Sequence, residues 1–322
     1  MVSVRFEEAD VTVKEGATLL EALLDAGHDI PNSCRAGACQ SCMLQATEGT
    51  PPAAAQNGLK ETQKQQGYFL ACRCEPEAPI TVQRGAEAKT VPAVLVSKQL
   101  LTPSVLQLRF NAELDYLPGQ YVNLLRHDGL FRSYSIASVP GVDGYVELQL
   151  RIFPDGQFSQ WALNDFVVGE SIEMQGPFGD CFYTESDLTQ PVLMAATGTG
   201  LAPLYGIVRD ALQRGHTGDI QLMAGAKNAE GLYLVDELNA LADRYPNLTY
   251  TPVVLEDGDL PAGCAVGDLN TVVKDKVADT KGYRAYFCGS EERVKKLRKQ
   301  TFLAGANMQD IFCDLFTPSS QV

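Results

Sequence analysis

The sequence predicts three domains of different fold classes in one chain: a small cysteine-rich α+β domain, an antiparallel Greek-key β-barrel, and an α/β domain built on a doubly wound parallel sheet. The chain has 322 residues, which is too long for a single hydrophobic core. Five of its nine cysteines lie between residues 34 and 74. Near residue 190, closely spaced short strands give way to strands that alternate with amphipathic helices. We therefore expect domains at residues 1–90, 91–188 and 189–322.

The amino-acid composition limits the kinds of binding partner and the cellular location that we expect. The formal net charge is −14, so nucleic acid is not expected as a partner, because phosphates need neutralisation by Lys and Arg. Taken alone, the charge indicates solubility, although an acidic surface also suits a basic patch on a partner protein. The chain has no run of about 18 apolar residues and its first residues alternate as a strand does, so we expect no membrane span and no secretory signal. These features predict a cytoplasmic protein.

The first domain is expected to open with a β-hairpin within residues 2–13. Thr18 then suits the N-cap of a helix that ends near Gly27. Residues 35–79 are expected to be mostly loop, and residues 79–82 to form a closing strand.

The cysteines of this domain have the spacing C-x4-C-x2-C, followed by a fourth cysteine after 29 further residues. This is the plant-type spacing for a [2Fe–2S] cluster. Small residues and glycine between the cysteines allow backbone N–H groups to approach the sulfurs. A structural zinc site usually has two C-x2–4-C pairs, and a second pair is not evident. The expected cluster ligands are Cys34, Cys39, Cys42 and Cys72.

Cys74 competes with Cys72 for the fourth position. Residues 30–35 and 70–72 both resemble the corresponding segments of plant-type ferredoxins, so we assign Cys72. The resemblance implies a β-grasp fold for this domain. Gln40 departs from the glycine that is usual in that family, which is expected to alter the potential or exposure of the cluster without preventing ligation.

The second domain contains repeated short strands, separated by turn residues at intervals that suit a small antiparallel barrel. One helix is expected near residues 159–165. The strands are expected at residues 93–97, 105–110, 120–125, 133–137, 145–152 and 171–175.

One of these strands carries the sequence Arg132-Ser133-Tyr134-Ser135, which resembles the R-x-Y-[ST] motif of the ferredoxin–NADP reductase superfamily. Arg132 is suited to bind flavin phosphate oxygens in a bidentate manner. The resemblance implies that Tyr134 presents a flat face to the flavin and that Ser135 reaches the flavin N5 atom. Taken alone, the motif is a weak signal, because an alternating edge strand with one Arg explains it better.

Two further segments support a flavin site. The segment 156–159 precedes a short helix, so its backbone N–H groups and its serine hydroxyl are candidates for binding a pyrophosphate. Residues 176–179 follow a strand, as the G-P-x-G turn of the superfamily does. The candidate residues of the first segment are Gly156, Gln157, Phe158 and Ser159.

The third domain alternates apolar strands with amphipathic helices, which predicts a parallel, doubly wound sheet. In such a sheet, ligands bind at the carboxyl ends of the strands. Strands are expected at residues 191–196, 220–224, 248–255, 283–288 and 309–313, and helices at 202–214, 235–245, 268–276 and 291–304.

The first strand of this sheet runs into a glycine-rich turn with the sequence GTGLAP, which brings a dinucleotide pyrophosphate close to the backbone and the helix N-terminus. It resembles the reductase superfamily pattern G-x-G-[IL]-[AT]-P. A later strand ends in a Cys-Gly pair, and the resemblance implies that this cysteine packs near the nicotinamide C4 atom and the flavin; taken alone, it reads as a small buried hydrophobe. The candidates are Gly198, Thr199, Gly200, Pro203, Cys288 and Gly289.

The C-terminal segment 312–316 contains two phenylalanines. Members of the superfamily often place a terminal aromatic residue over the isoalloxazine ring, so the resemblance implies this role for Phe316 and a core position for Phe312. The alternative is that both belong to the core. The residues expected at the reacting centre are therefore Ser135, Cys288 and Phe316.

The order of the three motif sets resembles the reductase components of bacterial ring-hydroxylating dioxygenases and methane monooxygenase. The resemblance implies FAD as the flavin and NADH as the donor; NADPH stays open, because Lys227 alone does not make a phosphate site. It implies that a hydride passes to the flavin and that single electrons pass through a [2Fe–2S] cluster to an electron-accepting protein, an oxygenase component. We expect a monomer that docks transiently.

Three other hypotheses remain on the sequence alone. The first is a nicotinamide-linked reductase that serves another acceptor, such as a deoxysugar dehydrase. The second is a redox-sensing protein that keeps the cofactors without dedicated turnover. The third is a zinc-containing nucleotide-binding module, which would be colourless.

Overall fold

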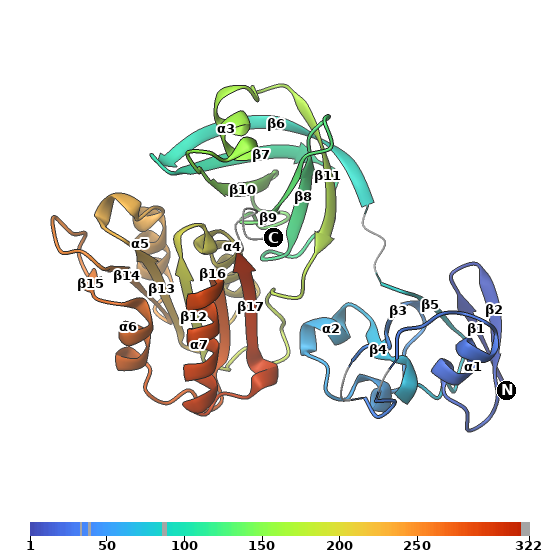
Figure 1. Cartoon of the computed structure of the whole chain (residues 1–322). Helices are drawn as coiled ribbons and strands as arrows, with labels where there is room; N and C mark the ends of the chain where they lie inside the picture. The colour runs from blue at the N-terminus through green and yellow to red at the C-terminus, as the bar shows by residue number, and fades with distance from the viewer. Residues whose placement is uncertain (33, 38–39, 86–88, 317–322) are drawn as a thin grey trace. The chain divides into compact units, whose positions relative to one another are not determined.

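A computed structural model describes residues 1–32, 34–37, 40–85 and 89–316 (Figure 1). The chain divides into two compact units, Met1–Glu87 and Ala88–Val322, which we call the N-terminal unit and the C-terminal unit. Across the described residues, every helix is too short or too polar to span a membrane.

The N-terminal unit has a β-grasp fold. Its elements are β1 (Val2–Phe6), β2 (Ala9–Val13), α1 (Leu19–Asp25), β3 (Met43–Glu48), α2 (Glu61–Gln65), β4 (Tyr68–Leu70) and β5 (Ile80–Gln83). The strands form one sheet in the order β2-β1-β5-β3-β4, in which β1 and β5 are parallel and the other pairs antiparallel. The apolar residues of the sheet and of α1 share one core.

Helix α1 forms where the sequence predicts it. The Thr18 side chain accepts a hydrogen bond from the Glu21 backbone, and the Glu21 carboxylate accepts one from the Thr18 backbone, which completes a capping box. Residues 35–79 are mostly outside helices and strands, as expected, although the short elements β3, α2 and β4, which were not predicted, lie there. These elements have three to six residues, too short for a periodic pattern to stand out.

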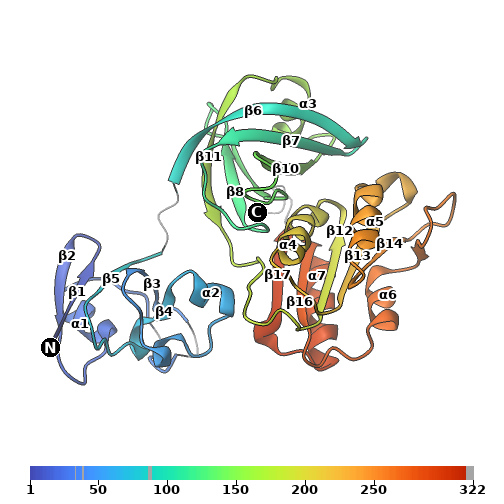
Figure 2. The same ribbon diagram turned by 180° about the vertical axis from the view of Figure 1, so that it is seen from behind.

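The first part of the C-terminal unit is an antiparallel barrel (Figure 2). Its elements are β6 (Lys89–Thr102), β7 (Val105–Ala112), β8 (Tyr121–Leu125), β9 (Phe131–Ser135), β10 (Val146–Arg151), α3 (Gln157–Asn164) and β11 (Ser171–Phe178). The strand order is β10-β7-β6-β11-β8-β9, and a bridge between Ile136 and Leu148 joins the two outer strands and closes the barrel. Lys98 Nζ donates to three carbonyls at the end of α3, those of Ala162, Leu163 and Phe166.

The second part of this unit is a parallel sheet with helices on both faces. Its elements are β12 (Val192–Thr197), α4 (Leu201–Gln213), β13 (Ile220–Ala226), α5 (Val235–Arg244), β14 (Leu248–Val254), β15 (Ala265–Val266), α6 (Leu269–Lys276), β16 (Arg284–Ser290), α7 (Glu291–Leu303) and β17 (Ile311–Phe316). All strand pairs are parallel, in the order β15-β14-β13-β12-β16-β17. The predicted fold class is therefore confirmed, although β15, with two residues, was not predicted.

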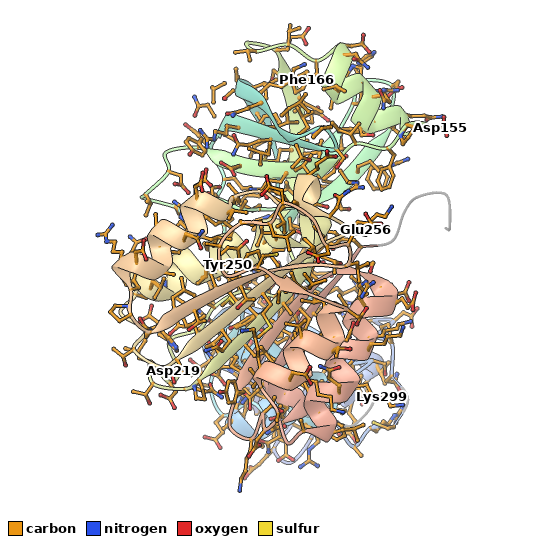
Figure 3. All side chains as sticks on the ribbon, turned by 90° about the vertical axis from the view of Figure 1, so that its left-hand side faces the viewer. Asp155, Phe166, Asp219, Tyr250, Glu256 and Lys299 are labelled. Atoms are coloured by element: carbon orange, nitrogen blue, oxygen red, sulfur yellow. The ribbon has the colours of Figure 1, made fainter. Side chains whose placement is uncertain are left out.

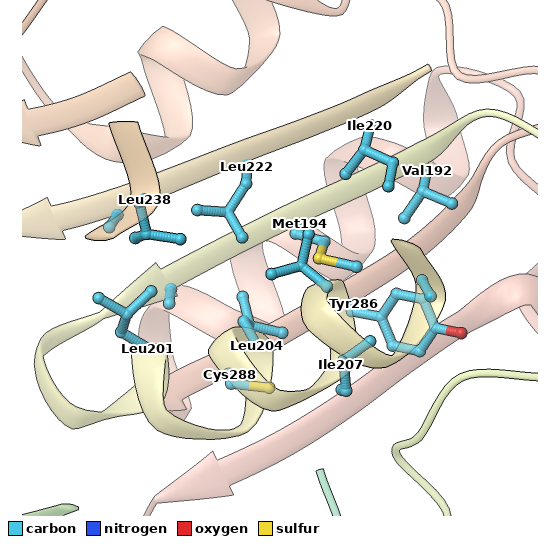
Figure 4. Close-up of a cluster of buried hydrophobic side chains, with 14 of the residues drawn as sticks. Val192, Met194, Leu201, Leu204, Ile207, Ile220, Leu222, Leu238, Tyr286 and Cys288 are labelled. Carbon is cyan, nitrogen blue, oxygen red and sulfur yellow. The ribbon is translucent and has the colours of Figure 1, made fainter. Parts of the chain in front are cut away.

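Separate apolar clusters cover the two faces of this sheet. Residues of α4 and α5 pack on one face, where Met194, Leu204 and Cys288 lie together (Figure 4). Residues of α6 and α7 pack on the other face. Figure 3 shows Asp219, which precedes β13, at one end of the sheet, and Glu256, which follows β14, at the end that faces the barrel.

The barrel and the sheet approach each other closely along α4. Gly119 of the barrel has φ +96°, and a Cβ there would lie 2.6 Å from Ile207 Cδ1 and collide with the Cys181 carbonyl. A Cβ at Gly206 would lie 3.1 Å from the Ala137 carbonyl oxygen. These two contacts place α4 against the segments of the barrel that precede β8 and follow β9.

Candidate functional site

The expected cluster cysteines come from the loop before β3 and from the turn after β4. Cys34, Cys42 and Cys72 lie within the described residues, and Cys39 lies outside them. Cys34 is exposed, whereas the other two are buried. Burial, a hydrogen bond with the Cys42 thiol and the nearby charge of Cys42 raise the pKa of Cys72 to about 11. The Cys42 and Cys72 sulfurs are therefore adjacent.

Backbone donors point at these sulfurs. The Gly37 N–H hydrogen-bonds the Cys72 sulfur, and the Ala36 N–H donates to Cys34 Sγ at 3.4 Å. Such donors stabilise the extra electron on a thiolate-ligated cluster. Among the described residues, which leave out Cys39, no three Cys, His, Asp or Glu side chains form a compact metal-binding group. A [2Fe–2S] cluster therefore fits this donor set.

The structure separates the two candidates for the fourth ligand. Cys74 is fully buried in the core of the N-terminal unit, and burial raises the pKa of its thiol to about 12. The Cys74 backbone carbonyl accepts a hydrogen bond from the Leu19 N–H, which holds Cys74 against the first residue of α1. Cys72 instead lies beside Cys42, so the geometry supports Cys72 as the ligand.

Gln40 adopts the left-handed conformation, with φ +58°. This conformation favours glycine, which explains why a glycine is usual there in plant-type ferredoxins. In this chain the Gln40 side chain donates to the Gly58 carbonyl at 3.0 Å and ties the cluster loop to the segment before α2.

The flavin motif lies on β9. The Arg132 guanidinium donates to the neighbouring Phe131 carbonyl, and within the part of the chain that the structure describes it has no carboxylate within ion-pair distance. The Tyr134 ring packs beside Phe158, 5.6 Å between ring centres, and burial raises the pKa of Tyr134. The Ser133 hydroxyl donates to Asn123 at 2.7 Å. An unpaired guanidinium beside an aromatic face fits a flavin nucleotide.

The N-terminus of α3 supplies backbone donors. Gly156 occupies the N-cap, and no side chain caps this end of the helix. The Ser159 hydroxyl is used within the loop, because it donates to the Gly156 carbonyl and accepts the Phe153 N–H. The Phe158 side chain is in the barrel core. The first-turn N–H groups of Gln157 and its neighbours are therefore better candidates for a pyrophosphate than the Ser159 hydroxyl.

The nucleotide turn lies at the carboxyl ends of β12 and β16, where the strand order reverses. A Cβ at Gly200 would collide with the Cys288 carbonyl, and one at Gly289 would collide with the Thr197 side chain. Glycine is thus required at both strand ends for the close approach. Pro203 lies in the first turn of α4, whose N-terminus carries no side-chain cap, and Thr199 lies in the 3-10 turn before it.

A cavity of about 420 Å³ opens beside this turn. It reaches across the ends of β12, β13 and β14, which is where parallel sheets bind ligands. Its lining includes Arg151, Thr197, Gly198, Lys227, Glu230 and Arg293.

The barrel and the sheet meet at Ser135, Asp314 and Cys288. Ser135 Oγ donates to Asp314 Oδ2 at 2.6 Å, and Asp314 on β17 is the strand neighbour of Cys288 on β16. Burial raises the pKa of the Asp314 carboxyl, and the Ser135 hydrogen bond partly offsets this. Burial and a hydrogen bond with the Cys181 thiol hold the pKa of Cys288 well above its usual value, so its thiol is neutral.

Asp314 was not predicted. The sequence offered one signal, a carboxylate inside the apolar strand sequence IFCDLF. Phe316 is partly buried next to Ser290 at the end of β17, close in sequence to the reacting centre. Phe312 is fully in the core and stacks on Tyr286 with ring centres 5.1 Å apart.

Comparisons with known proteins identify all three parts of the chain. Residues 4–77 match the family model described as a 2Fe-2S iron-sulfur cluster binding domain. Residues 92–183 match the oxidoreductase FAD-binding domain, and residues 194–299 the oxidoreductase NAD-binding domain.

Relatives match along nearly the whole chain. The reductase component of the naphthalene 1,2-dioxygenase system of Pseudomonas putida is 31% identical, with 94% of both chains covered. A CDP-6-deoxy-L-threo-D-glycero-4-hexulose-3-dehydrase reductase of Yersinia pestis is 30% identical, again with 94% of both chains covered. Among solved structures, the Amycolatopsis cytochrome P450 reductase GcoB is 27% identical, with a TM-score of 0.70 over 99% of both chains. The chain therefore belongs to the ferredoxin–NAD(P)(+) reductase components, as an NADH-dependent iron–sulfur flavoprotein oxidoreductase that uses FAD and a [2Fe–2S] cluster.

Proposed function

We propose that this chain is the reductase component of an oxygenase system, which oxidises NADH and delivers single electrons to an oxygenase component. The observation that carries the proposal is the hydrogen bond between Ser135 and Asp314. It joins the flavin strand of the barrel to the strand beside Cys288, where a nicotinamide and a flavin ring have to meet. Relatives named as reductases of naphthalene and terephthalate dioxygenases and of an aromatic O-demethylase support an oxygenase as the acceptor.

The candidate residues divide into three binding roles. Arg132 and the N-terminus of α3 would hold the pyrophosphate of FAD, and the turn at residues 198–203 would hold that of the nicotinamide nucleotide. When bound, these groups supply hydride transfer and single-electron passage: NADH and two oxidised acceptors give NAD⁺, one proton and two reduced acceptors. The cluster would be held by Cys34, Cys39, Cys42 and Cys72.

The chain's own residues prepare the reacting centre. Asp314 fixes the orientation of the Ser135 hydroxyl, and the pair is placed to hold a proton at Ser135 Oγ or Asp314 Oδ2. Cys288 stays neutral and fully buried, so it fills space and excludes water without adding charge. Phe316 is proposed as the aromatic residue that covers the flavin ring.

The decisive experiment is an anaerobic titration of the purified protein with NADH, followed by visible absorption and low-temperature EPR. We expect both flavin and iron–sulfur absorption to bleach, with a reduced [2Fe–2S] signal. Bleaching of the flavin alone would contradict the proposed route. No bleaching with either nucleotide would overturn the function itself.

A reductase for a deoxysugar dehydrase is the second candidate. The Yersinia pestis relative with that name is 30% identical over the same share of the chain as the dioxygenase reductase. Reconstitution with purified oxygenase or dehydrase components separates the two candidates. Rapid NADH-dependent turnover with either acceptor would also exclude a redox sensor without turnover.

The cavity supports selectivity for NADH over NADPH. Lys227 Nζ is already paired with Glu256 at 3.1 Å, and Glu230 adds a carboxylate to the lining. A carboxylate repels a 2′-phosphate and accepts hydrogen bonds from ribose hydroxyls. We expect kcat/KM to favour NADH at least about tenfold, and Glu230→Gln to reduce the ratio.

We also propose that the protein is a cytoplasmic monomer that docks transiently. Among the described residues, no two cysteines form a disulfide, which suits a reducing compartment. Cell fractionation and light scattering of the holoprotein test the two statements.

A further inference from the structure

The charges of the N-terminal unit are divided between the two edges of its sheet. β2 and β1 form one edge, whereas β3 and β4 form the other (Figure 1). The cluster loop leads into β3, and Cys72 follows β4, so the cluster site adjoins the second edge. Charged residues between positions 30 and 74 are mostly basic, namely Arg35, Lys60, Lys64 and Arg73 against Glu48 and Glu61.

Two arginines border the cluster site directly, and we call Arg35 and Arg73 the cationic rim. Each follows a cluster cysteine in the sequence, and both are exposed. The stem of Arg73 covers the cluster loop, since its Cγ would lie 3.2 Å from a Cβ at Gly37. Arg35 Nε donates to the neutral Asn32 side chain at 3.1 Å.

The cationic rim retains its positive charge. Within the described part of the chain, neither arginine has a carboxylate within ion-pair distance. Glu21 is near enough to Arg35 for the charge to contribute to its lowered pKa, but the Glu21 carboxylate is bound to Thr18 in the capping box. The two guanidinium groups are therefore free to meet a partner at the edge of the cluster.

The opposite edge has the reverse balance. Arg84 is neutralised by Glu7 at 2.8 Å, and Arg5 lies 3.8 Å from Asp10. Acidic residues of β1, β2 and the turns that flank them outnumber basic ones; they are Glu7, Glu8, Asp10 and Glu15, against Arg5 and Lys14. The β1–β2 edge of the N-terminal unit therefore carries an excess of acidic residues, whereas two arginines border the cluster site.

We propose that the cationic rim is the docking surface for the electron acceptor, and that the acceptor presents carboxylates around its own redox centre. The inference rests on the proposed function and adds the charge of the partner to it. This local difference in charge favours contact of an acidic protein with the cationic rim rather than with the acidic edge. The net charge of the whole chain, −14, is compatible with a basic partner but, taken alone, indicates only solubility.

The electron balance of this docking step is simple. One electron leaves the reduced cluster and reduces one acceptor centre, so two dockings consume the two electrons of one NADH. No proton or group crosses the docking surface. The rim therefore affects association and orientation, and its effect is screened by salt, because the screening length falls from about 10 Å at 0.1 M to about 3 Å at 1 M.

The test uses the holoenzyme with two haem proteins as acceptors: cytochrome b5, which is acidic, and cytochrome c, which is basic. We expect kcat/KM for cytochrome b5 to fall at least about tenfold between about 0.02 M and 0.5 M salt. Arg35→Glu/Arg73→Glu should lower the low-salt value about tenfold or more and flatten its salt dependence. Arg35→Gln/Arg73→Gln should give an intermediate loss, and serves if the reversed variant does not fold.

The matched control is Arg5→Glu/Lys14→Glu, which changes the net charge equally at the opposite edge. We expect this variant to retain most of the cytochrome b5 activity. Every rate is divided by the same variant's rate of cluster bleaching by NADH without an acceptor. If the control loses as much activity as the rim variant, or if the rim variant keeps its salt dependence, the rim is not the docking surface.

The same arginines could instead act only by compensating the negative charge of the cluster. That role predicts a lower midpoint potential in the reversed variant, equal changes for both cytochromes, and an unchanged salt dependence, which would overturn the proposal. Failure of NADH to bleach the cluster in the unmodified protein would instead overturn the proposed function, so the two failures are distinguishable.

Discussion

The two redox regions of this chain are built in opposite ways. The reacting centre of the C-terminal unit draws its side chains from β9, β16 and β17, and its Ser135 and Cys288 are buried. The cluster site draws its cysteines from one loop and one turn, and Cys34 is exposed. Hydride transfer needs atoms held close together away from water, whereas a single electron has to leave through the surface. The difference in construction follows from the particle that each region transfers.

Removal of a cluster ligand should give the largest difference in effect between the cluster site and the reacting centre. Cys72→Ser is expected to abolish the cluster and to lower NADH-dependent cytochrome reduction by more than about 100-fold, because four thiolates are needed to hold the two irons. The flavin absorption and its bleaching by NADH are expected to persist. Iron content, visible spectra and stopped-flow kinetics measure the three quantities.

The matched variant for this prediction is Cys74→Ala. Cys74 lies in the core and is not assigned as a ligand, so this variant should keep its iron. Loss of iron from Cys74→Ala together with its retention in Cys72→Ser would reverse the assignment.

Changes at the buried centre should affect the first step of the reaction. Ser135→Ala and Asp314→Asn are each expected to slow flavin bleaching by NADH about 100-fold, since each removes one member of a preorganised pair. The double variant should be scarcely slower than either single variant, because the two residues act as one unit. Additive losses in stopped-flow bleaching would show that the hydrogen bond between them is incidental.

The close approach of barrel and sheet can be tested with two glycines of similar backbone conformation. Gly119→Ala should destabilise the protein by about 3 kcal/mol or more, because the added Cβ meets the Cys181 carbonyl and Ile207. Gly129→Ala has nothing within 4 Å and a φ of +86°, so it should cost only about 1 kcal/mol of backbone strain. Thermal unfolding of both variants makes the comparison, and equal losses would mean that the contact is not tight.

Much of this architecture was predictable because long periodic elements carry strong signals. The strands and helices of the nucleotide domain fall within a few residues of the expected ranges. β3 and β4 were missed because they are short and depend on pairing with distant β5 and with each other. Asp314 was missed because its role exists only once β17 lies beside β16. The hydrogen bonds of the Ser159 hydroxyl within its loop could not be read from the sequence, because they depend on how the loop folds.

The charge of Asp314 at the buried centre is expected to lower the free energy of unfolding at neutral pH. Burial raises the pKa of Asp314 above its unfolded value, so the stability that the neutral form contributes is lost as pH rises through the folded pKa. Asp314→Asn removes that ionisation and should raise the free energy of unfolding by about 1 kcal/mol at pH 7. The gain should vanish below the unfolded pKa of about 3.9. Urea unfolding at several pH values checks both statements, and a gain that persists in acid would point to another cause.

The smallest expected effect concerns backbone strain in the exposed cluster loop. Gln40 combines an unfavourable φ of +58° with a side-chain hydrogen bond to Gly58. Gln40→Ala keeps the strain and loses the hydrogen bond, whereas Gln40→Gly loses the hydrogen bond and relieves strain of about 1 kcal/mol. The glycine variant should therefore hold its cluster to a higher urea concentration than the alanine variant, measured by loss of iron–sulfur absorption. Equal urea midpoints for the two variants would mean that the loop relaxes freely around Gln40. The cluster region would then store no backbone strain, and it would differ even more from the tightly packed centre of the C-terminal unit.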